Sequence, residues 1–304
     1  MNVRPGDRVA LVAPAGPAPG HQLAAAVDLV LSWGLVPITF PSATATHERA
    51  DYLSGSDQAR AADVQRAWCD PDIAAVFCIR GGYGTVRILD LLDRDAMAAA
   101  TPKPVLGSSD ITALHEWLRE QLGVSTWFTP MLSTRAVLED EASREGLRTA
   151  VLDPGSVDRW TSDRATTLVP GHAEGTMIGG NLSLLAATVG ARGRPRLDNT
   201  GCLALLEDYT EQTYRIDGYL QTLLRAGWFD GVTGIALGSW ADCSPVEEIH
   251  ALCLETLGPL GVPLVGELGF GHGPAAHSLP LGVPGALFAT ETAPYLTSSG
   301  RLDR

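Results

Sequence analysis

The chain has 304 residues, of which 45% are hydrophobic and 19% charged, a composition that fits about two globular domains and excludes a disordered chain. Lysine and arginine total 22 against 35 aspartates and glutamates, so the formal net charge is -13. An acidic surface repels phosphate groups, and we therefore expect neither nucleic acid nor a membrane surface among the partners.

No pattern in the sequence is typical of a secreted, membrane-spanning or zinc-binding protein. Residues 9–13 form an apolar run that ends at Pro14, too short for the core of a signal peptide. No apolar run approaches the ~18–20 residues of a membrane helix. The five cysteines show no Cys-x-x-Cys spacing, so we expect free thiols, a cytoplasmic protein and no metal. These cysteines are Cys69, Cys78, Cys202, Cys243 and Cys253.

The first half of the chain alternates short apolar runs with helical patterns. Strands are predicted over residues 9–13, 35–40, 74–79 and 104–107, and helices over 23–31, 57–68, 84–92 and 114–122. Because strict alternation of strands and helices is typical of a parallel sheet covered by helices, the sequence predicts an α/β domain of the flavodoxin or Rossmann type.

The alternation breaks down over residues 153–170, where Asp, Pro, Gly and Thr gather, and we interpret this stretch as a linker. It separates an N-terminal domain of residues 1–152 from a C-terminal domain of residues 171–304. The second domain mixes helices with short strands, which predicts a smaller, β-rich α+β domain. Helices are expected after Asn181 and over 216–224, and strands over 202–206, 234–238, 264–265 and 279–282.

The sharpest local motif is Gly107-Ser-Ser-Asp-Ile-Thr112, between a predicted strand and a predicted helix. A serine on such a tight turn projects its hydroxyl from the carboxyl end of the sheet, where backbone N–H groups and the positive helix end stabilise an oxyanion. The Gly-x-Ser-x-Gly form of a nucleophile elbow is absent. The alternative is that Ser108, Ser109 or Asp110 only caps the helix, and the local pattern by itself favours this cap.

A glycine-rich loop, Arg80-Gly-Gly-Tyr-Gly84, follows the third predicted strand. Ligands of open α/β sheets bind at the carboxyl ends of strands, so this loop and Ser109 are expected to line one crevice. Glycines expose backbone N–H groups there, and an arginine grips a carboxylate by two hydrogen bonds. The alternative is a simple glycine turn with a surface arginine. Nucleotide-binding patterns of the Gly-x-Gly-x-x-Gly or Gly-Lys-Ser/Thr type do not occur here.

Two acidic residues, Glu207 and Asp208, follow the strong apolar strand 202–206. A carboxylate at this position can orient a histidine, which serine catalysis needs as its base. The alternative is that these residues begin the next helix, where the dipole favours negative charge, and this fits Asp208 and Glu211 better than Glu207.

Seven histidines are candidates for that base. His272 lies in the glycine-flanked segment Gly269-Phe-Gly-His-Gly273, and His277 is its main rival. His115 is expected on the outer face of the helix after Ser109. The other four occur in polar contexts, where a histidine is usually only solvated. They are His21, His47, His172 and His250.

Together these segments resemble the LD-carboxypeptidase family of serine peptidases, which also contains the microcin C self-immunity hydrolases. Six motifs occur in the family's order over nearly the whole chain. They are Gly6-Asp-Arg-Val-Ala-Leu-Val-Ala-Pro14, Arg80-Gly-Gly-Tyr-Gly84, Gly107-Ser-Ser-Asp-Ile-Thr112, Glu174-Gly-Thr-Met-Ile-Gly-Gly-Asn181, Leu206-Glu-Asp208 with Tyr214-Arg-Ile-Asp217, and Phe270-Gly-His272 with Leu279-Pro-Leu-Gly282.

The resemblance implies a catalytic triad of Ser109, Glu207 and His272. It also implies that the α/β domain donates the serine, that the C-terminal domain donates the other two residues, and that the site lies between them, often in a homodimer. No metal or organic cofactor is needed. Two positions depart from the family and bear on substrate fit: Ser108, where relatives often have an aromatic residue or histidine, and Gly218, where they usually have arginine.

Within such a mechanism, His272 takes the proton of Ser109 while Glu207 holds the other ring nitrogen. We expect the oxyanion hole at the backbone N–H of Asp110 together with that of Gly81 or Gly82. Arg80 and Tyr83 are expected to bind the substrate, Arg80 through its terminal carboxylate.

The function implied by the resemblance is release of terminal D-alanine from cytosolic murein tetrapeptides during peptidoglycan recycling. Two alternatives stay open. One is hydrolysis of aminoacyl or peptidyl nucleotides, as in the immunity relatives, which would favour an aromatic residue to stack on the base and an added loop that the sequence does not show. The other is a non-catalytic protein that only binds muropeptides, which would have no need of all three triad residues.

Overall fold

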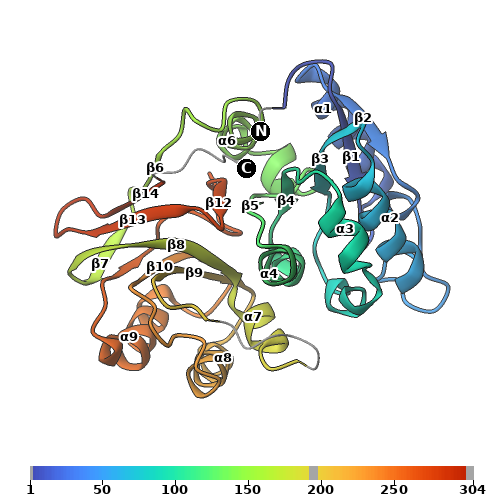
Figure 1. Ribbon diagram of the computed structural model, residues 1–304. Coiled ribbons are helices and arrows are strands. Elements are labelled where there is room, and N and C mark those ends of the chain that lie inside the picture. The colour runs from blue at the N-terminus through green and yellow to red at the C-terminus, as the bar shows by residue number, and fades with distance from the viewer. Residues whose placement is uncertain (1–2, 192–197, 299–304) are drawn as a thin grey trace.

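The computed structural model describes residues 3–191 and 198–298, which form two β-sheets packed with helices (Figure 1). The predicted fold class, a mixed α/β protein with a parallel sheet in its first half, is confirmed. Among the described residues, no helix combines the length and the apolar composition needed to cross a bilayer.

The first sheet has the strand order β12-β5-β4-β3-β1-β2, and its five strands from the first half are parallel. Apolar residues face both sides of this sheet because helices cover both faces: one core cluster includes side chains of α2 and α4, and the other side chains of α1 and α6. The strands are β1 (Arg8–Val12), β2 (Val36–Thr39), β3 (Ile73–Cys78), β4 (Val105–Gly107) and β5 (Thr126–Phe128). The helices around them are α1 (Gly20–Ser32), α2 (Asp57–Cys69), α3 (Arg94–Ala99), α4 (Thr112–Leu122), α5 (Arg135–Leu138) and α6 (Glu141–Leu152).

One predicted helix is absent from the first half. Residues 84–92 form two short 3₁₀ turns, η2 (Thr85–Arg87) and η3 (Leu89–Leu91), in place of an α-helix. Apolar residues three or four apart over so short a segment do not distinguish an α-helix from a 3₁₀ helix. The segment begins at Gly84, which has a φ of 127°.

The second sheet has the order β6-β14-β13-β8-β9-β10-β11-β7. Its centre, β8 to β11, is parallel, and antiparallel strands flank it on both sides. Helices α7, α8 and α9 pack on one face (Figure 1). The strands are β6 (Arg159–Trp160), β7 (Thr166–Val169), β8 (Gly171–Asn181), β9 (Cys202–Tyr209), β10 (Gly234–Ala241), β11 (Leu264–Gly266), β13 (Pro284–Ala289) and β14 (Tyr295–Ser298). The helices are α7 (Leu182–Thr188), α8 (Thr213–Arg225) and α9 (Val246–Leu257).

The C-terminal half of the chain contributes a strand to the first sheet. Strand β12 (Leu279–Leu281) comes late in the chain but pairs antiparallel with β5 at the edge of the first sheet. The stretch 153–170, predicted as a linker, holds β6 and β7, which both belong to the second sheet. Phe128 of β5 meets Phe270 edge-on at 6.2 Å within a core that also contains side chains of the second sheet. The domain boundaries at residues 152 and 171 stay a prediction. The two sheets pack against each other through one shared core.

Candidate active site

Ser109 lies on a strained turn between β4 and α4. The strand ends at Gly107, and the one-turn 3₁₀ segment η4 (Ser109–Ile111) leads into the helix at Thr112. Ser109 has a φ of 58°, a left-handed conformation that costs a residue with a side chain about 1–2 kcal/mol. Ser108 stands at the cap position but its side chain makes no capping hydrogen bond. The geometry is therefore that of a turn that presents Ser109, and the alternative of a simple serine cap is not seen.

The glycine loop after β3 lies directly against this serine. A Cβ added to Gly81 would stand 3.0 Å from the Ser109 Cβ and 3.1 Å from its Oγ, so the hydroxyl and the Gly81 backbone are in close approach. The turn after β1 joins them, since the Gly16 N–H donates to the Gly81 carbonyl at 3.0 Å. The expectation that the loop 80–84 and the serine share one crevice agrees with this arrangement.

Asp110 ties the serine turn to the glycine loop through its side chain. It is fully buried, and its Oδ2 accepts a hydrogen bond from the Thr85 backbone N–H at 2.7 Å. Burial raises the pKa of this carboxyl above its ordinary value. Among the hydrogen bonds of the described residues, the backbone N–H groups of Gly81 and Gly82 have no protein acceptor, and Gly82 is exposed.

Glu207 and His272 form a partly buried pair. Glu207 lies near the end of β9 without exposed surface, and its Oε2 lies 2.7 Å from His272 Nδ1. Since a carboxylate accepts, Nδ1 carries the proton and Nε2 keeps its lone pair. Burial alone would lower the pKa of His272, but the charge and hydrogen bond of Glu207 raise it above its ordinary value. Gly271 permits the approach: a Cβ there would lie 2.5 Å from Glu207 Oε2.

Contacts connect this pair to the serine turn. The Asn181 side chain donates from Nδ2 to Glu207 Oε1 at 3.3 Å, and the Asn181 backbone N–H donates to Thr112 Oγ1 at 3.0 Å. Thr112 begins α4 three residues after Ser109. Within the described residues no hydrogen bond joins Ser109 to His272. The structure thus brings Glu207 and His272 together, and Asn181 and Thr112 connect this pair to the serine turn. The hydrogen bond between Ser109 and His272 stays a prediction.

Sequence reasoning missed three contributors to the pair. Besides Asn181, Tyr209 stacks its ring on that of His272 at 4.8 Å with an interplanar angle of 12°. Ser239 Oγ accepts from the Gly273 backbone N–H at 2.9 Å and so fixes the histidine loop. The motif ending at Asn181 was noticed as a family feature, but only the fold shows which side chain it contacts. Nothing in the sequence marks Tyr209 or Ser239.

The other candidate histidines have structural contacts. His277 places Nε2 2.7 Å from the Thr161 carbonyl, away from the Glu207 pair. The expectation that His115 faces outward is wrong: it is 2% exposed, donates from Nε2 to the Gly107 carbonyl at 2.9 Å, and burial lowers its pKa to about 4. His115 is buried because α4 lies between the two sheets, so that neither side of this helix faces solvent alone (Figure 1).

The predicted substrate residues lie at the rim of the glycine loop. Arg80 is half-buried, and its Nη1 reaches Gln22 Oε1 at 3.5 Å, a weak contact that leaves the guanidinium free to bind an anion. Tyr83 is 47% exposed and packs edge-on against Tyr52 at 5.9 Å. Of the two departures from the family, Ser108 is buried and Gly218 is exposed on α8 with open space around it.

The other two acidic residues considered beside Glu207 have partners other than a histidine. Asp208 is buried within β9 and does not begin a helix of its own, contrary to the alternative for this residue. Glu211 precedes α8 and pairs with Arg215 at 2.7 Å. In the described parts of the chain, no three His, Cys, Asp or Glu residues are grouped as a metal site would require.

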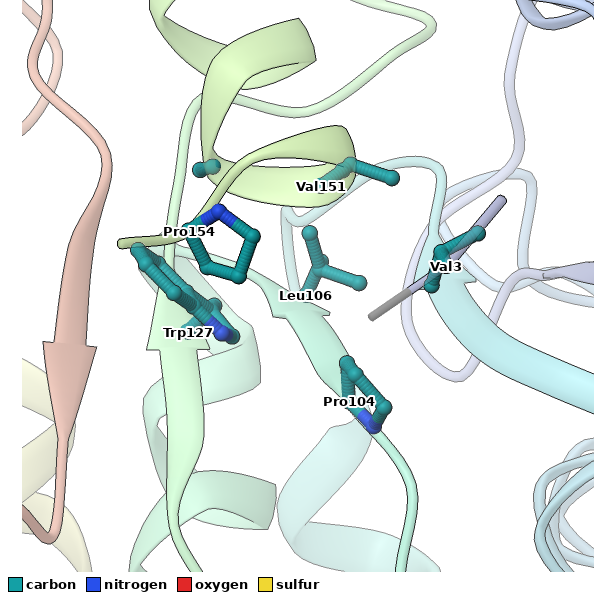
Figure 2. A pocket seen from close by; sticks show the side chains of 7 residues that line it. Val3, Pro104, Leu106, Trp127, Val151 and Pro154 are labelled. Atoms are coloured by element: carbon teal, nitrogen blue, oxygen red, sulfur yellow. The ribbon is translucent and has the colours of Figure 1, made fainter. Parts of the chain in front are cut away.

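A separate apolar pocket lies behind the first sheet. Figure 2 shows it between α6 and strands β4 and β5, and none of the predicted site residues lines it. Its walls are Val3, Pro104, Leu106, Trp127, Ala150, Val151 and Pro154. With no titratable side chain in this lining, the pocket offers packing surface and no chemistry.

A partly buried carboxylate–histidine pair close to a serine on a strained turn is typical of the hydrolases that use a serine nucleophile. Residues 9–129 match the LD-carboxypeptidase N-terminal domain and residues 174–287 the LD-carboxypeptidase C-terminal domain. The chain therefore belongs to the LD-carboxypeptidase family of peptidases, as the sequence motifs predict.

Individual relatives agree with this membership. A Streptomyces coelicolor protein provisionally named a carboxypeptidase is 48% identical over 97% of this chain and 96% of its own. The murein tetrapeptide carboxypeptidase of Pseudomonas aeruginosa is 32% identical over 90% of this chain and 91% of its own. The solved complex of MccF with glutamyl sulfamoyl guanosine has the same fold, with a TM-score of 0.86 at 20% identity over 100% of this chain and 99% of its own.

Proposed function

We propose that this chain is a serine LD-carboxypeptidase that releases the terminal D-alanine of murein tetrapeptides, with Ser109 as nucleophile, His272 as base and Glu207 as its partner. The observation that carries the proposal is the partly buried 2.7 Å bond between Glu207 and His272 Nδ1. It holds the ring in the tautomer whose Nε2 can take a proton, and the strained serine turn lies in contact with the same group of residues.

In the proposed reaction, Ser109 Oγ attacks the carbonyl of the bond between an L-configured centre and D-alanine, while its proton passes to His272 Nε2. The imidazolium then gives this proton to the leaving nitrogen, so that the C–N bond breaks and D-alanine departs. Water attacks the resulting ester by the same route and frees Ser109. The oxyanion hole is assigned to the N–H of Asp110 together with that of Gly81 or Gly82. The absence of a protein acceptor for the Gly81 and Gly82 N–H groups among the described residues supports this assignment.

Arg80 is the proposed partner of the D-alanine carboxylate, with Tyr83 beside it. A guanidinium at the rim of the glycine loop, held only by the weak contact to Gln22, can turn toward a bound anion. The proposed enzyme uses no cofactor. We also propose a cytoplasmic homodimer: all five cysteines are free thiols, which suits a reducing compartment, and light scattering after gel filtration measures the oligomeric state.

A second candidate is hydrolysis of aminoacyl or peptidyl nucleotides. The exposed pair of Tyr52 and Tyr83, next to the glycine loop, offers aromatic faces on which a base could stack. The related MccF was solved with glutamyl sulfamoyl guanosine.

One experiment separates the two candidates. The purified protein is incubated with L-Ala-D-Glu-mDAP-D-Ala and, in parallel, with an aminoacyl sulfamoyl adenosine, and mass spectrometry follows both. Release of D-alanine that disappears in Ser109→Ala supports the first proposal. Cleavage of the adenosine derivative alone would replace it with the second. Cleavage of neither compound would favour a protein that only binds muropeptides.

A further inference from the structure

Asn181 stands between the serine turn and the Glu207–His272 pair. It is buried at the junction of β8 and α7, and its backbone N–H donates to Thr112 Oγ1 at 3.0 Å. Its side chain donates from Nδ2 to Glu207 Oε1 at 3.3 Å and to Asp208 Oδ1 at 2.9 Å. One residue therefore contacts the helix that follows Ser109 and the carboxylate that holds His272.

The orientation of the Asn181 amide is fixed by its role as a helix cap. Its Oδ1 accepts from the Leu184 backbone N–H at 3.2 Å and from Ser183 Oγ at 2.7 Å. With the oxygen committed to the first turn of α7, the NH₂ group must face the carboxylates of Glu207 and Asp208, which are acceptors when ionised.

Asp208 holds this NH₂ group from the other side. It is buried, and its oxygens also accept from the backbone N–H groups of Ser183 at 2.8 Å and Tyr209 at 2.9 Å. Burial and the neighbouring charge of Glu207 raise the pKa of Asp208 to about 6. A donor between two buried carboxylates reduces their repulsion, so Asn181 is held where Glu207 needs a partner.

The two oxygens of Glu207 have separate partners. Oε2 binds His272 Nδ1 and Oε1 binds Asn181 Nδ2, and these are its hydrogen bonds within the described residues. A carboxylate held at one oxygen can rotate, whereas one held at both keeps a single orientation.

We propose that Asn181 is a positioning residue that holds Glu207 in the orientation required by His272 and links this pair to the serine turn through Thr112. The inference rests on the proposed function, because it assigns Asn181 to the same reaction. The two glycines before Asn181 fit this role: a Cβ on Gly180 would lie 2.6 Å from Thr112 Oγ1, so a side chain there would prevent the close approach.

The test uses Asn181→Ser, because serine is also a good helix cap but its shorter side chain cannot bring an NH₂ group to Glu207 Oε1. We expect kcat to fall about 10- to 100-fold with KM little changed, the size of effect seen when supporting residues of catalytic groups are removed. Asp93→Ala, which removes the cap of the distant helix α3, is the control and should keep wild-type kcat. Should Asn181→Ser fail to fold, Asn181→Thr is the second variant, because threonine is also a helix cap without an NH₂ group, and the same loss is expected.

A double-mutant cycle distinguishes positioning from a general structural role. If Asn181 acts through Glu207, adding Asn181→Ser to Glu207→Gln should lower kcat no further, whereas damage to the fold would lower it in both backgrounds. Equal losses in both backgrounds, or a wild-type kcat in Asn181→Ser, would overturn the proposal.

The ¹⁵N shifts of the His272 ring give a readout that needs no substrate. In the wild type they should report a proton on Nδ1, and in Asn181→Ser they should move toward the average of two tautomers. Unchanged shifts would count against the positioning role. If the wild type cleaved no peptide but the shifts still moved, the proposed function would fail while the positioning role stood.

Discussion

At the scale of single residues, the proposed chemistry depends on how His272 is held. Glu207 binds its Nδ1, and Tyr209 stacks on one face of its ring. The His272 side chain is 19% exposed. A histidine with this exposure can reach a substrate while its tautomer is set by a carboxylate that has no contact with water.

Replacement of Glu207 by glutamine should lower kcat/KM by about 10³–10⁴-fold. Glutamine keeps the size of the side chain but can donate toward Nδ1, which favours the tautomer with the proton on Nε2 and removes the base. Initial rates of D-alanine release measure the effect, and circular dichroism checks the fold. A loss of less than tenfold would show that His272 does not depend on Glu207.

The pH dependence of kcat/KM should show an acid limb whose midpoint lies above the ordinary histidine value of about 6.5, since Glu207 raises the pKa of His272. Only neutral imidazole accepts the serine proton, so activity rises with pH through this limb. In Glu207→Gln the charge and hydrogen bond of Glu207 are lost, while burial, which lowers the pKa, and the charge of Asp208, which raises it, remain, so the midpoint should move down. An acid limb that stayed in place would assign it to another group.

The stability contributed by the same ion pair has the opposite dependence on pH. Because the pKa of His272 is higher in the folded than in the unfolded state, this stability is fully present below the unfolded value. It is lost as pH rises through the folded value. The proposed activity is therefore highest at pH values above the folded pKa of His272, where the ion pair no longer stabilises the fold.

At the scale of elements, the serine turn and the histidine loop are positioned by helix termini. Asp140 caps α6 by accepting from Ser143 N at 3.0 Å, and its other oxygen accepts from the backbone N–H of Ala275 at 2.8 Å, three residues after His272. Ser143 Oγ accepts from Ala276 N at 2.8 Å. The N-terminus of α6 therefore fixes the loop that carries His272.

Asp140→Ala should lower the free energy of unfolding by about 1–2 kcal/mol, because it removes a helix cap and a bond to the loop. It should also lower kcat, since the loop loses its anchor. Ser56→Ala removes only the cap of α2, where Ser56 Oγ accepts from Ala59 N at 3.2 Å, and serves as the matched control. Denaturant unfolding and initial rates give both quantities. Equal kcat in the two variants would show that the anchor is dispensable.

The elements also show which parts of the fold can be predicted from sequence. Strands β1 and β3 can be predicted because their buried runs are long, and α2 because Ser56 caps it. Strand β5 has three residues, too few to show a period, and the sequence does not predict it. Strand β12 is predicted as a strand over 279–282, but its pairing with β5 in the first sheet is not. The contacts of Asn181 and His115 arise where the second sheet meets α4. Propensity and spacing contain no information about such contacts, and the proposed triad of Ser109, Glu207 and His272 rests on the family motifs.

At the scale of the whole molecule, the two sheets share a core at the candidate site. Phe128 is buried between them: it packs on Phe270, its strand pairs with β12, and a Cβ on Gly180 of β8 would lie 3.1 Å from its ring. If either sheet unfolds, the other therefore loses its contacts in the shared core. We expect cooperative unfolding of one unit even though the family divides the chain into two matched domains.

Phe128→Ala tests this coupling. Loss of the ring should lower the free energy of unfolding by about 3–5 kcal/mol through lost burial and the cavity it leaves. Since the ring belongs to the shared core, the midpoint should fall equally for far-ultraviolet circular dichroism, for tryptophan fluorescence and for loss of activity. Met97→Ala, in the core of the first sheet away from the second, is the control, and its three midpoints should also coincide. If activity in Phe128→Ala were lost well before the secondary structure, the two sheets would separate as independent units, and the site would depend on their docking more than on their folding.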